Sequence, residues 1–474
     1  MRGLMFVKLQ TKVSDFYMQS SSKLVPTISK SNSLPILKEL AAQRSLLSGM
    51  SAMHKELGNL FAITIPGFKP VVVAGGEGAH ELLVDQRQHF KWRVESDPVA
   101  RLLRHGILVE DGDSHDRLRS YMQPALKRSK IENYHEEMLD CCDQVIFSWK
   151  NGSTLDMLVE MRKMALMILM RTLFSVDISP HLERLWDPIL RILKYISPGL
   201  WILKPEFPRL GYQASIDALD EYLYEIIRER RLNDPGHDDL LADLLSRQDL
   251  DDDLIRDQML TMLIAGHDTS TALLSWVLYL LCQHPVVMEK AKSEVDQALG
   301  DESPTTNRIS QLHYLDQIIK ESLRLFPPIH AANRVADSDL NLQGCPVSKG
   351  TRVMFSYYLT HRDEQVWVDP ERFDPARFER ENAPKVPPFS YLPFGGGPRN
   401  CIGAAFAQSE AKIILARILQ NFNLELADPN VQVHMGATLE PKPGVMLRIF
   451  KRDKVTTGKA ESGIISSRGI LTQV

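Results

Sequence analysis

The chain has 474 residues, of which 44% are hydrophobic and 24% are charged, a balance typical of a globular protein with a substantial core. The formal net charge of −4 excludes the strongly basic composition of a general nucleic-acid-binding protein. The five cysteines are odd in number and show no paired spacing, which argues against a disulfide framework and against a zinc site. We therefore expect a protein of a reducing compartment, the cytoplasm, that binds no nucleic acid.

The two ends of the chain differ in composition from its middle. Residues 1–34 are rich in Ser and Lys and lack the apolar segment of a signal peptide. This composition also fits a transit peptide, but an irregular N-terminal extension is the preferred interpretation. Residues 453–474 contain many small and polar residues and are expected to form a loose tail, which leaves residues 35–452 as the folded domain. No apolar run reaches the length that spans a bilayer, so we expect no transmembrane helix.

Short segments rich in β-branched residues flank a helical middle. Residues 62–65 and 70–73 lie on either side of Gly67 and predict a hairpin. Helical patterns dominate from about residue 78 to residue 299, and residues 341–358 carry turn signals that predict a small antiparallel sheet. The predicted fold class is therefore mainly α with a small β region.

Residues 192–210 interrupt the helical region. Pro198, Gly199, Pro205 and Pro208 surround the apolar run of residues 200–203. Because proline and glycine break helices, this pattern predicts a loop between two helices with exposed apolar residues at its tip.

A helix of about 30 residues is predicted from Asp251 to His284, because acidic residues open it and Pro285 follows it. At 1.5 Å per residue it would extend over about 45 Å and cross the whole domain. Its middle, residues 265–271, contains glycine and repeated Ser and Thr, which are poor helix formers. We expect a break in the helix at this point, and a break in the best helix indicates a functional segment.

The segment of residues 391–403 places Cys401 between a glycine-rich loop and a helix predicted over residues 404–422. The positive end of a helix dipole stabilises a thiolate, which is the form of cysteine that binds metals. Glycine has no Cβ, so the backbone at Gly395 and Gly403 can lie against a flat group, and Arg399 adds a fixed cation. A thiolate, a close surface and a cation together fit an iron porphyrin, which has a metal, a flat face and propionates.

Phe394, Gly397, Arg399, Cys401 and Gly403 match the haem-binding signature of the cytochromes P450 at every defined position. Further motifs of that family stand in the expected order, namely the segment 265–271, a Glu-x-x-Arg pair and the loop of residues 369–378. The chain therefore resembles this family from about residue 35 to residue 451. The resemblance implies one mainly helical domain that encloses a haem b (iron protoporphyrin IX).

The resemblance also assigns roles to individual residues. Cys401 would be the axial ligand of the haem iron, and Asp268 with Thr269 would relay protons for oxygen activation. Glu321 and Arg324, by spacing only a weak surface pair, would join Arg377 in a buried cluster that locks the loop of Cys401. The other residues expected to hold the haem or its propionates are Arg399, His115, Arg119, Arg334, Phe394, Gly395 and Gly403. The residues expected to line the substrate pocket are Ala265, Ile329, Ala331, Ala332 and Leu439.

The function implied is a monooxygenase that inserts one atom of O2 into a lipophilic substrate, such as a fatty acid, terpenoid or steroid. Electrons would come from a separate donor, of the ferredoxin or flavodoxin type or a flavin reductase, docking near the basic residues Lys127, Arg128 and Lys130. Residues 192–210 would form the lid of the substrate channel. Two alternatives stay open here: a peroxide-using peroxygenase or isomerase of the same fold, and a non-catalytic haem-binding sensor. The presence of Asp268 and Thr269 argues against both, because neither alternative needs protons delivered to dioxygen.

Overall fold

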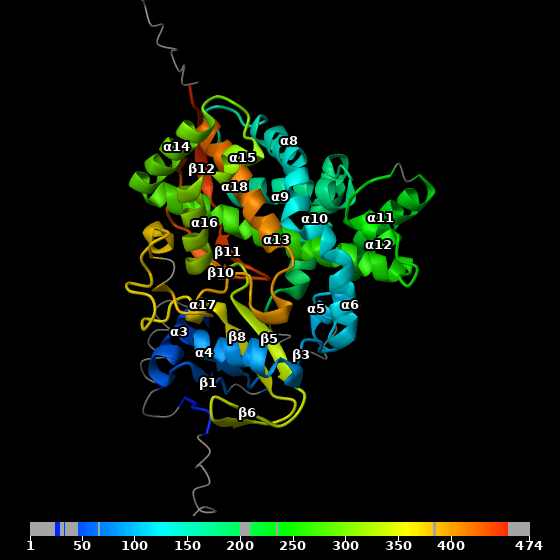
Figure 1. The fold of residues 1–474 in the computed structure, drawn as a ribbon, viewed down its shortest axis with the longest axis vertical. Helices are drawn as coiled ribbons and strands as arrows, with labels where there is room; N and C mark the ends of the chain where they lie inside the picture. The colour runs from blue at the N-terminus through cyan, green and yellow to red at the C-terminus, as the bar shows by residue number, and fades with distance from the viewer. Residues whose placement is uncertain are drawn as a thin grey trace, which may run out of the picture.

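A computed structural model describes residues 24–28, 33, 46–64, 67–199, 209–233, 236–382 and 385–453. Helices account for most of the described chain and the strands form small sheets, as predicted (Figure 1). The α-helices are α3 (Leu46–Leu57), α4 (Gly75–His80), α5 (Pro98–Leu103), α6 (Gly112–Met122), α7 (Arg128–Ile131), α8 (His135–Ile146), α9 (Met157–Phe174), α10 (Leu182–Ile196), α11 (Gln213–Leu232), α12 (Leu240–Leu245), α13 (Asp252–Gln283), α14 (Pro285–Leu299), α15 (Thr306–Ser310), α16 (His313–Leu325), α17 (Tyr357–Thr360) and α18 (Ala404–Asn421).

The strands pair in short ladders. They are β1 (Leu60–Ala62), β2 (Val71–Val73), β3 (Phe90–Lys91), β4 (Thr154–Asp156), β5 (Ala331–Ala336), β6 (Leu340–Leu342), β7 (Cys345–Val347), β8 (Arg352–Ser356), β9 (Phe422–Leu426), β10 (Gln432–Met435), β11 (Leu439–Lys442) and β12 (Met446–Lys451). The hairpin predicted around Gly67 is β1–β2, in which Leu60 lies opposite Val73. A second sheet joins β4, β12 and β9, and β10 pairs with β11.

The prediction of a purely antiparallel sheet at residues 341–358 is wrong in part. Strands β6 and β7 do form an antiparallel hairpin. Strand β8 instead joins a five-stranded sheet of order β1-β2-β8-β5-β3, parallel to β2 and antiparallel to β5. Parallel strands need a long crossover, and here the helical region between β2 and β8 supplies it. Local turn signals carry no information on such a distant partner.

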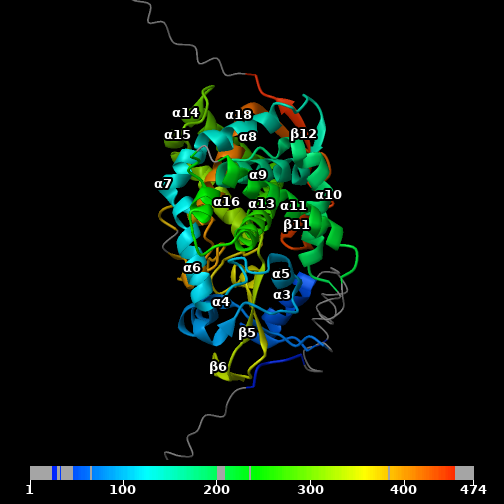
Figure 2. The ribbon, with the colours of Figure 1, turned by 90° about the vertical axis from the view of Figure 1, so that its right-hand side faces the viewer.

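The helices and the five-stranded sheet occupy different ends of the molecule. In Figures 1 and 2, α8, α9, α14, α16 and α18 gather at one end, and α3, α4 and β5 lie toward the other. Helix α13 lies between them in both views and contacts α9, α11, α16 and α18. A site bordered by α13 is therefore enclosed by both parts.

Helix α13 runs without the break that the sequence predicts. It has 32 residues, which corresponds to about 48 Å, and the Asp251 carboxylate accepts the Leu254 N–H at 2.8 Å as an N-cap. The hydroxyls of Thr269 and Thr271 donate to carbonyls four residues earlier, at 2.8 and 2.7 Å. These bonds share carbonyls with the helix rather than replace its backbone bonds, so the helix continues through the segment.

Part of the predicted N-terminal extension is ordered against the sheet. Thr27 forms a parallel bridge with Ala62, and the Ala62 N–H donates to the Pro26 carbonyl at 2.8 Å. The structured chain therefore starts before residue 35, because the edge of β1 offers backbone groups that residues 24–28 satisfy.

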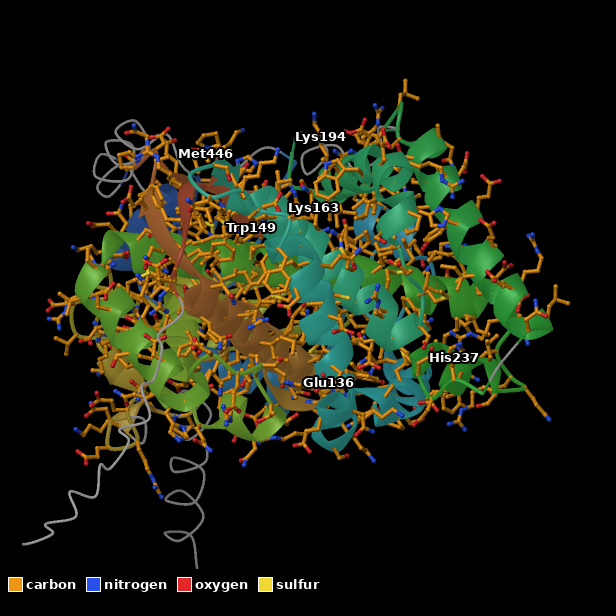
Figure 3. The ribbon with its side chains drawn as sticks, turned by 90° about the horizontal axis from the view of Figure 1, so that it is seen from above. Glu136, Trp149, Lys163, Lys194, His237 and Met446 are labelled. Atoms are coloured by element: carbon orange, nitrogen blue, oxygen red, sulfur yellow. The ribbon has the colours of Figure 1, made fainter. Side chains whose placement is uncertain are left out.

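The core between the helical end and the C-terminal sheet is closely packed. Figure 3, which looks down from the helical end, shows Trp149 between α9 and the strand that carries Met446. The Trp149 ring centroid lies 5.2 Å from that of Phe422, and its Nε1 donates to the Glu160 carboxylate at 2.7 Å. A buried indole that has both an aromatic neighbour and a hydrogen-bond acceptor fixes the position of these elements.

The segment predicted as a lid falls largely outside the described residues. Helix α10 extends to Ile196 and α11 begins at Gln213, while residues 200–208 are not described. Among the described ranges, no single helix is long and apolar enough to cross a membrane. The consecutive helices α13 and α14 reach such a length together, but they meet at an angle of 112°.

Candidate active site

A cavity of about 2620 Å³ lies between α13, the loop before α18, strand β5 and helix α3. Its lining includes Cys401, Thr269 and Arg334, three residues that are far apart in the sequence. The volume exceeds the roughly 300–1,000 Å³ of an ordinary small-molecule site. The cavity therefore has room for a large prosthetic group together with a substrate.

Backbone hydrogen bonds close the loop that carries Cys401. The Cys401 N–H donates to the Phe394 carbonyl at 2.8 Å, and the Asn400 N–H donates to the Gly397 carbonyl at 3.1 Å. Gly397 has a φ of +68°, and a Cβ at this position would collide with the Leu83 carbonyl oxygen. The loop needs glycine there, and it presents Cys401 and Phe394 to the cavity.

The position of Cys401 before a helix predicts a lowered thiol pKa, but the pKa is raised. Burial raises the pKa, and the Gly403 N–H and the charge of Arg119 act in the opposite direction without reversing it. Helix α18 begins at Ala404, so the cysteine lies outside its first turn. A metal cation at the sulfur would itself supply the charge that stabilises the thiolate.

Gly403 and Gly395 leave the backbone beside Cys401 bare. Both line the cavity, and a Cβ built on Gly403 would meet no atom within 4 Å. The φ of Gly403 is −91°, which any residue can adopt, whereas Gly395 has a φ of +72°. Packing within the protein therefore does not require glycine at position 403. A flat group lying against the loop would require it, because a side chain there would occupy the same space.

Arg334 places a buried cation at one end of the cavity. Arg334 is buried, its guanidinium lies 3.7 Å from the Trp92 ring centroid, and burial lowers its pKa to about 9. Arg334 has no ion pair among the described residues, and it donates to the Asn333 carbonyl at 2.8 Å. The Trp92 Nε1 is buried without a hydrogen-bond partner in the same part of the chain. A carboxylate of a bound group would satisfy both.

Arg399 already has a carboxylate partner in the protein. Its Nη1 lies 2.8 Å from Asp111 Oδ1, and its Nη2 donates to the Glu110 carbonyl. The sequence predicts a cation free for a propionate, so the structure changes this expectation. Burial lowers the pKa of Arg399, and the side chain still lines the cavity next to Trp92.

His115 and Arg119 share one face of α6, and both line the cavity. His115 is buried, its Nδ1 lies 2.9 Å from Asp116 Oδ1, and burial lowers its pKa. Arg119 donates to the carbonyl and to the side-chain oxygen of Asn400, each at 2.8 Å. Arg119 therefore fastens the residue before Cys401, a contact that the sequence does not predict.

These observations fit an iron porphyrin. The cavity offers a thiol as an axial ligand and, beside it, a backbone surface without side chains at the glycines. At the other end, Arg334 and the Trp92 Nε1 can both donate hydrogen bonds to an anion. Trp92 is a residue that sequence reasoning missed, because a single tryptophan after a short strand carries no motif.

Helix α13 faces the cavity with a narrow stripe of small residues. Ala265, Gly266 and Thr269 line the cavity and are at least partly exposed, whereas their neighbours His267 and Thr271 are fully buried. The spacing of the stripe follows one face of a helix. His267 bonds the Leu263 carbonyl through Nδ1, and burial lowers its pKa to about 4, so it is not directed at the cavity.

Asp268 is engaged in a buried ion pair. Its Oδ1 accepts from Arg162 of α9 at 3.0 Å, and its Oδ2 accepts from the Thr438 hydroxyl at 2.9 Å. Arg162 also reaches Glu440 at 3.4 Å, and burial raises the pKa of Glu440. The sequence predicts a relay between Asp268 and Thr269, but it does not reveal that both carboxylate oxygens are occupied by partners from α9 and from the segment before β11.

A second carboxyl group contacts Ser270, the residue after Thr269 on another face of α13. The Ser270 hydroxyl donates to Glu410 of α18 at 2.5 Å. Glu410 is buried, and burial raises its pKa to about 8. The Glu410 side chain is therefore largely protonated at neutral pH, and it ties α13 to the helix that follows Cys401.

Glu321, Arg324 and Arg377 come together in a buried cluster. Glu321 and Arg324 are fully buried and form two hydrogen bonds, at 2.7 and 2.9 Å, and Arg377 Nε lies 3.3 Å from the same carboxylate. Arg324 also donates to the carbonyls of His361 and Pro370, at 2.9 and 2.7 Å. The default interpretation of a weak surface pair is therefore wrong here.

His361 continues this network toward Cys401. Its Nε2 accepts the Leu392 N–H at 2.8 Å, which requires a neutral ring, and burial lowers its pKa to about 3. The Leu392 carbonyl accepts the Gly395 N–H at 3.1 Å. A continuous set of hydrogen bonds thus runs from Glu321 to the loop that presents the cysteine.

The predicted pocket residues are placed as expected with one exception. Ala265, Ile329, Ala331 and Ala332 line the cavity. Leu439 does not, because it is fully buried, and the wall at this point consists of Ala437 and Thr438. Successive residues at a strand point to opposite faces, so Thr438 and Leu439 cannot both face the cavity.

Glu321→Ala is expected to destabilise the protein by about 3–5 kcal/mol, because Arg324 and Arg377 lose their buried carboxylate. Denaturant unfolding and the haem content of the purified protein are the measurements. Glu425→Ala is the matched control, since its pair with Arg448 is exposed and should change the unfolding free energy by less than about 1 kcal/mol. A haem-replete Glu321→Ala protein as stable as this control would contradict the structural role.

Glu410→Gln is expected to flatten the pH dependence of stability. The Glu410 carboxyl ionises near 4.5 in an unfolded chain but near 8 in the fold, so between these values the folded state binds more protons. Stability therefore falls as pH rises through this window, by up to about 1.4 kcal/mol per pH unit. The glutamine variant keeps a neutral hydrogen-bonding group, and its thermal midpoint should fall less from pH 5 to pH 8. Parallel profiles of wild type and variant would show that Glu410 does not titrate in this range.

The chain is similar to known proteins over most of its length. The family model of the cytochromes P450 matches residues 32–448. The chain is 32% identical over 383 residues to cyclooctat-9-en-7-ol 5-monooxygenase of Streptomyces melanosporofaciens, a match that covers 77% of this chain and 83% of that protein. It is 30% identical over 407 residues to pentalenene oxygenase of Streptomyces avermitilis, with 83% and 91% covered.

A solved structure shares the whole fold. The crystal structure of the cytochrome P450DA heme domain aligns with a TM-score of 0.79 and 27% identity, covering 91% of this chain and 97% of that one. The fold, the cysteine loop and the family match thus agree over most of the chain. The chain belongs to the cytochrome P450 family and is a haem-dependent monooxygenase.

Proposed function

We propose that this monooxygenase holds a haem b through Cys401 and oxidises a terpenoid-like lipophile. The carrying observation is the single cavity in which the Cys401 loop and the small-residue stripe of α13 face a common space. The names of two relatives denote oxidation of cyclooctat-9-en-7-ol and of pentalenene, an unsaturated alcohol and an alkene. These names favour a terpenoid over the fatty acids and steroids that the sequence leaves open.

Different residues of the cavity would hold the haem and serve the reaction with oxygen. The haem, when bound, supplies the chemistry that activates dioxygen. Arg334 and Trp92 would hold a propionate at the cationic end, with His115 and Arg399 beside them. Ala265 leaves room for a bound group, Gly266 allows Leu169 of α9 to pack closely, and the Thr269 hydroxyl can pass a proton into the cavity.

The role of Asp268 follows from its partners. Arg162 and Thr438 each bond one carboxylate oxygen of Asp268 and fix this buried side chain, whereas Thr269 is partly exposed to the cavity. We therefore assign the hydroxyl of Thr269 to the immediate contact with oxygen. Asp268 then acts as a carboxylate that Arg162 holds in position behind the Thr269 hydroxyl.

Electrons would come from a separate donor of the ferredoxin or flavodoxin type or from a flavin reductase. Lys127 and Arg128 are exposed and suit an acidic partner, whereas Lys130 is paired with Asp238 and is less available than the sequence indicates. Arg119 and Asn400 connect this region to Cys401. All five cysteines are unpaired thiols, which suits the reducing cytoplasm.

The assignment of Cys401 is tested by spectroscopy of the reduced protein with carbon monoxide. Wild type should show the red-shifted band of thiolate ligation, and Cys401→His should lose it, because imidazole donates less charge to the metal. Cys282→Ser removes a thiol of α13 that does not line the cavity and should keep the band. An unchanged band in Cys401→His would overturn the assignment.

The role of Thr269 is tested by the yield of product per reductant oxidised. Thr269→Ala should still consume reductant but release hydrogen peroxide, with the product yield lowered about tenfold or more. Thr271→Ala removes the same kind of helix hydrogen bond, but Thr271 is buried away from the cavity and the variant should keep the wild-type yield. Equal yields in Thr269→Ala and wild type would contradict the proposed proton transfer.

A further inference from the structure

The chain between α5 and α6 forms a part of the cavity wall that side chains of α13 hold in place. This wall segment, residues 104–109, contains no helix or strand, and its last three residues line the cavity. The Asp257 carboxylate accepts the His105 N–H at 3.0 Å, and the Gln258 side chain accepts the Ile107 N–H at 2.8 Å. Two polar side chains of a helix thus replace the backbone partners that regular structure would supply.

The wall segment is strained at its first residue. Arg104 has a φ of +51° and a ψ of −96°, a backbone conformation that residues with a Cβ rarely adopt. Two positions later the backbone lies directly against α13, because a Cβ on Gly106 would lie 1.8 Å from the Thr261 Oγ1. Backbone strain persists only where surrounding contacts enforce it, so the docked position of the segment depends on its partners.

Four charged side chains connect the wall segment to α11 and α13. Arg104 of the wall segment donates to Asp220 of α11 at 2.6 Å. The Arg256 Nη1 of α13 lies 3.5 Å from one oxygen of Asp220 and 2.8 Å from one oxygen of Asp257. Asp220 is therefore shared by two arginines from different elements, and the two positive and two negative charges balance.

The hydrogen bonds of this charge cluster are incomplete. Arg256 and Asp257 are almost fully buried. One oxygen each of Asp220 and Asp257, and the Nε and Nη1 of Arg256, are buried without a hydrogen-bond partner. A partly satisfied network offsets less of the cost of burying its charges than a saturated one. The cluster therefore holds the wall segment less firmly than its charges alone suggest.

The four charged residues act on the cavity only through the wall segment. None of them is among the described residues that line the cavity, and no described residue of α11 lines it either. A strained segment without regular structure belongs to the parts of a protein that open at low free-energy cost. A change in the cluster would thus alter access to the cavity without removing a contact to a bound ligand.

We propose that Arg104, Asp220, Arg256 and Asp257 form a latch by which α11 holds the wall segment against α13. Release of the latch lets Arg104 relax to a negative φ and moves the apolar end of the segment away from the cavity, which opens a path for a lipophilic ligand. Because Asp220 belongs to α11, the position of α11 governs a wall that this helix does not itself form. The inference rests on the proposed function only for the identity of the substrate that enters.

The latch is tested by amide hydrogen exchange of the haem-loaded protein without added ligand. The His105 and Ile107 amides are the reporters, since both donate to side chains of α13. Asp220→Asn changes neither bond directly, yet it should raise their exchange rates about tenfold or more, because it removes a charge from the buried cluster. Asp252→Asn is the matched control: its exposed pair with Arg231 joins the same two helices, and the rates should stay within about threefold of wild type.

Opening of the cavity is tested by the rate at which 4-phenylimidazole binds. Its imidazole nitrogen is a general ligand for metals, so binding to the haem iron reports access whatever the natural substrate is. Asp220→Asn and Arg104→Gln should each raise the association rate in parallel with the exchange rates. The double variant should match Asp220→Asn, because both changes open the same latch.

Each outcome decides one part of the inference. Unchanged exchange in Asp220→Asn and Arg104→Gln overturns the latch, and so does an equal rise in Asp252→Asn. Faster exchange with an unchanged association rate overturns its role in opening the cavity. Arg104 is partly exposed, so Arg104→Gln decides the matter if Asp220→Asn does not fold. Absence of the thiolate band in wild type would refute the haem assignment alone, because the exchange measurement needs no ligand at the iron.

Discussion

The position of Cys401 depends on the buried carboxylate of Glu321. The loop before α18 contains only the short 3-10 helix Gly397–Arg399, so most of its backbone groups need partners from elsewhere. Glu321 accepts from Arg324, Arg377 and the Asp374 N–H, and Arg324 in turn donates to carbonyls of the chain between α17 and the cysteine loop. A buried charge is tolerated only when it is paired and fully hydrogen-bonded, and this requirement forces the loop into one arrangement.

The neutral ring of His361 extends that arrangement to the cysteine loop itself. Arg324 and Arg362 lie close to the ring, and both charges add to the effect of burial in lowering the pKa of His361. The ring can therefore accept the Leu392 N–H at any pH near neutrality. One carboxylate, two arginines and one histidine thus hold a thiol at the wall of a large cavity, where few packing contacts are available.

Local motifs predict the main helices and the cysteine loop, because the residues that determine these elements are close together in the sequence. The ends of α13 and α14, the cysteine loop and the Glu321–Arg324 pair all follow from neighbouring residues, caps and breakers. The partners of Asp268 were missed because Arg162 and Thr438 lie 106 and 170 positions away in the sequence. The parallel pairing of β2 with β8 and the unmatched Trp92 Nε1 have the same cause, since no local pattern reports a distant contact.

The small-residue stripe of α13 explains why hydrogen-bonding residues stand beside it on a helix that is otherwise largely apolar. Ala265 and Thr269 border the open cavity, so large interlocking side chains cannot fix the helix on that face, and Gly266 packs closely against Leu169 of α9. Hydrogen bonds of the flanking residues fix the helix instead: Asp268 accepts from Arg162, and Ser270 donates to Glu410. Further along, the Trp276 Nε1 donates to the Leu439 carbonyl at 2.9 Å. Directional bonds to α9, α18 and β11 position the stripe without filling the space that function requires, which is something apolar packing alone cannot do.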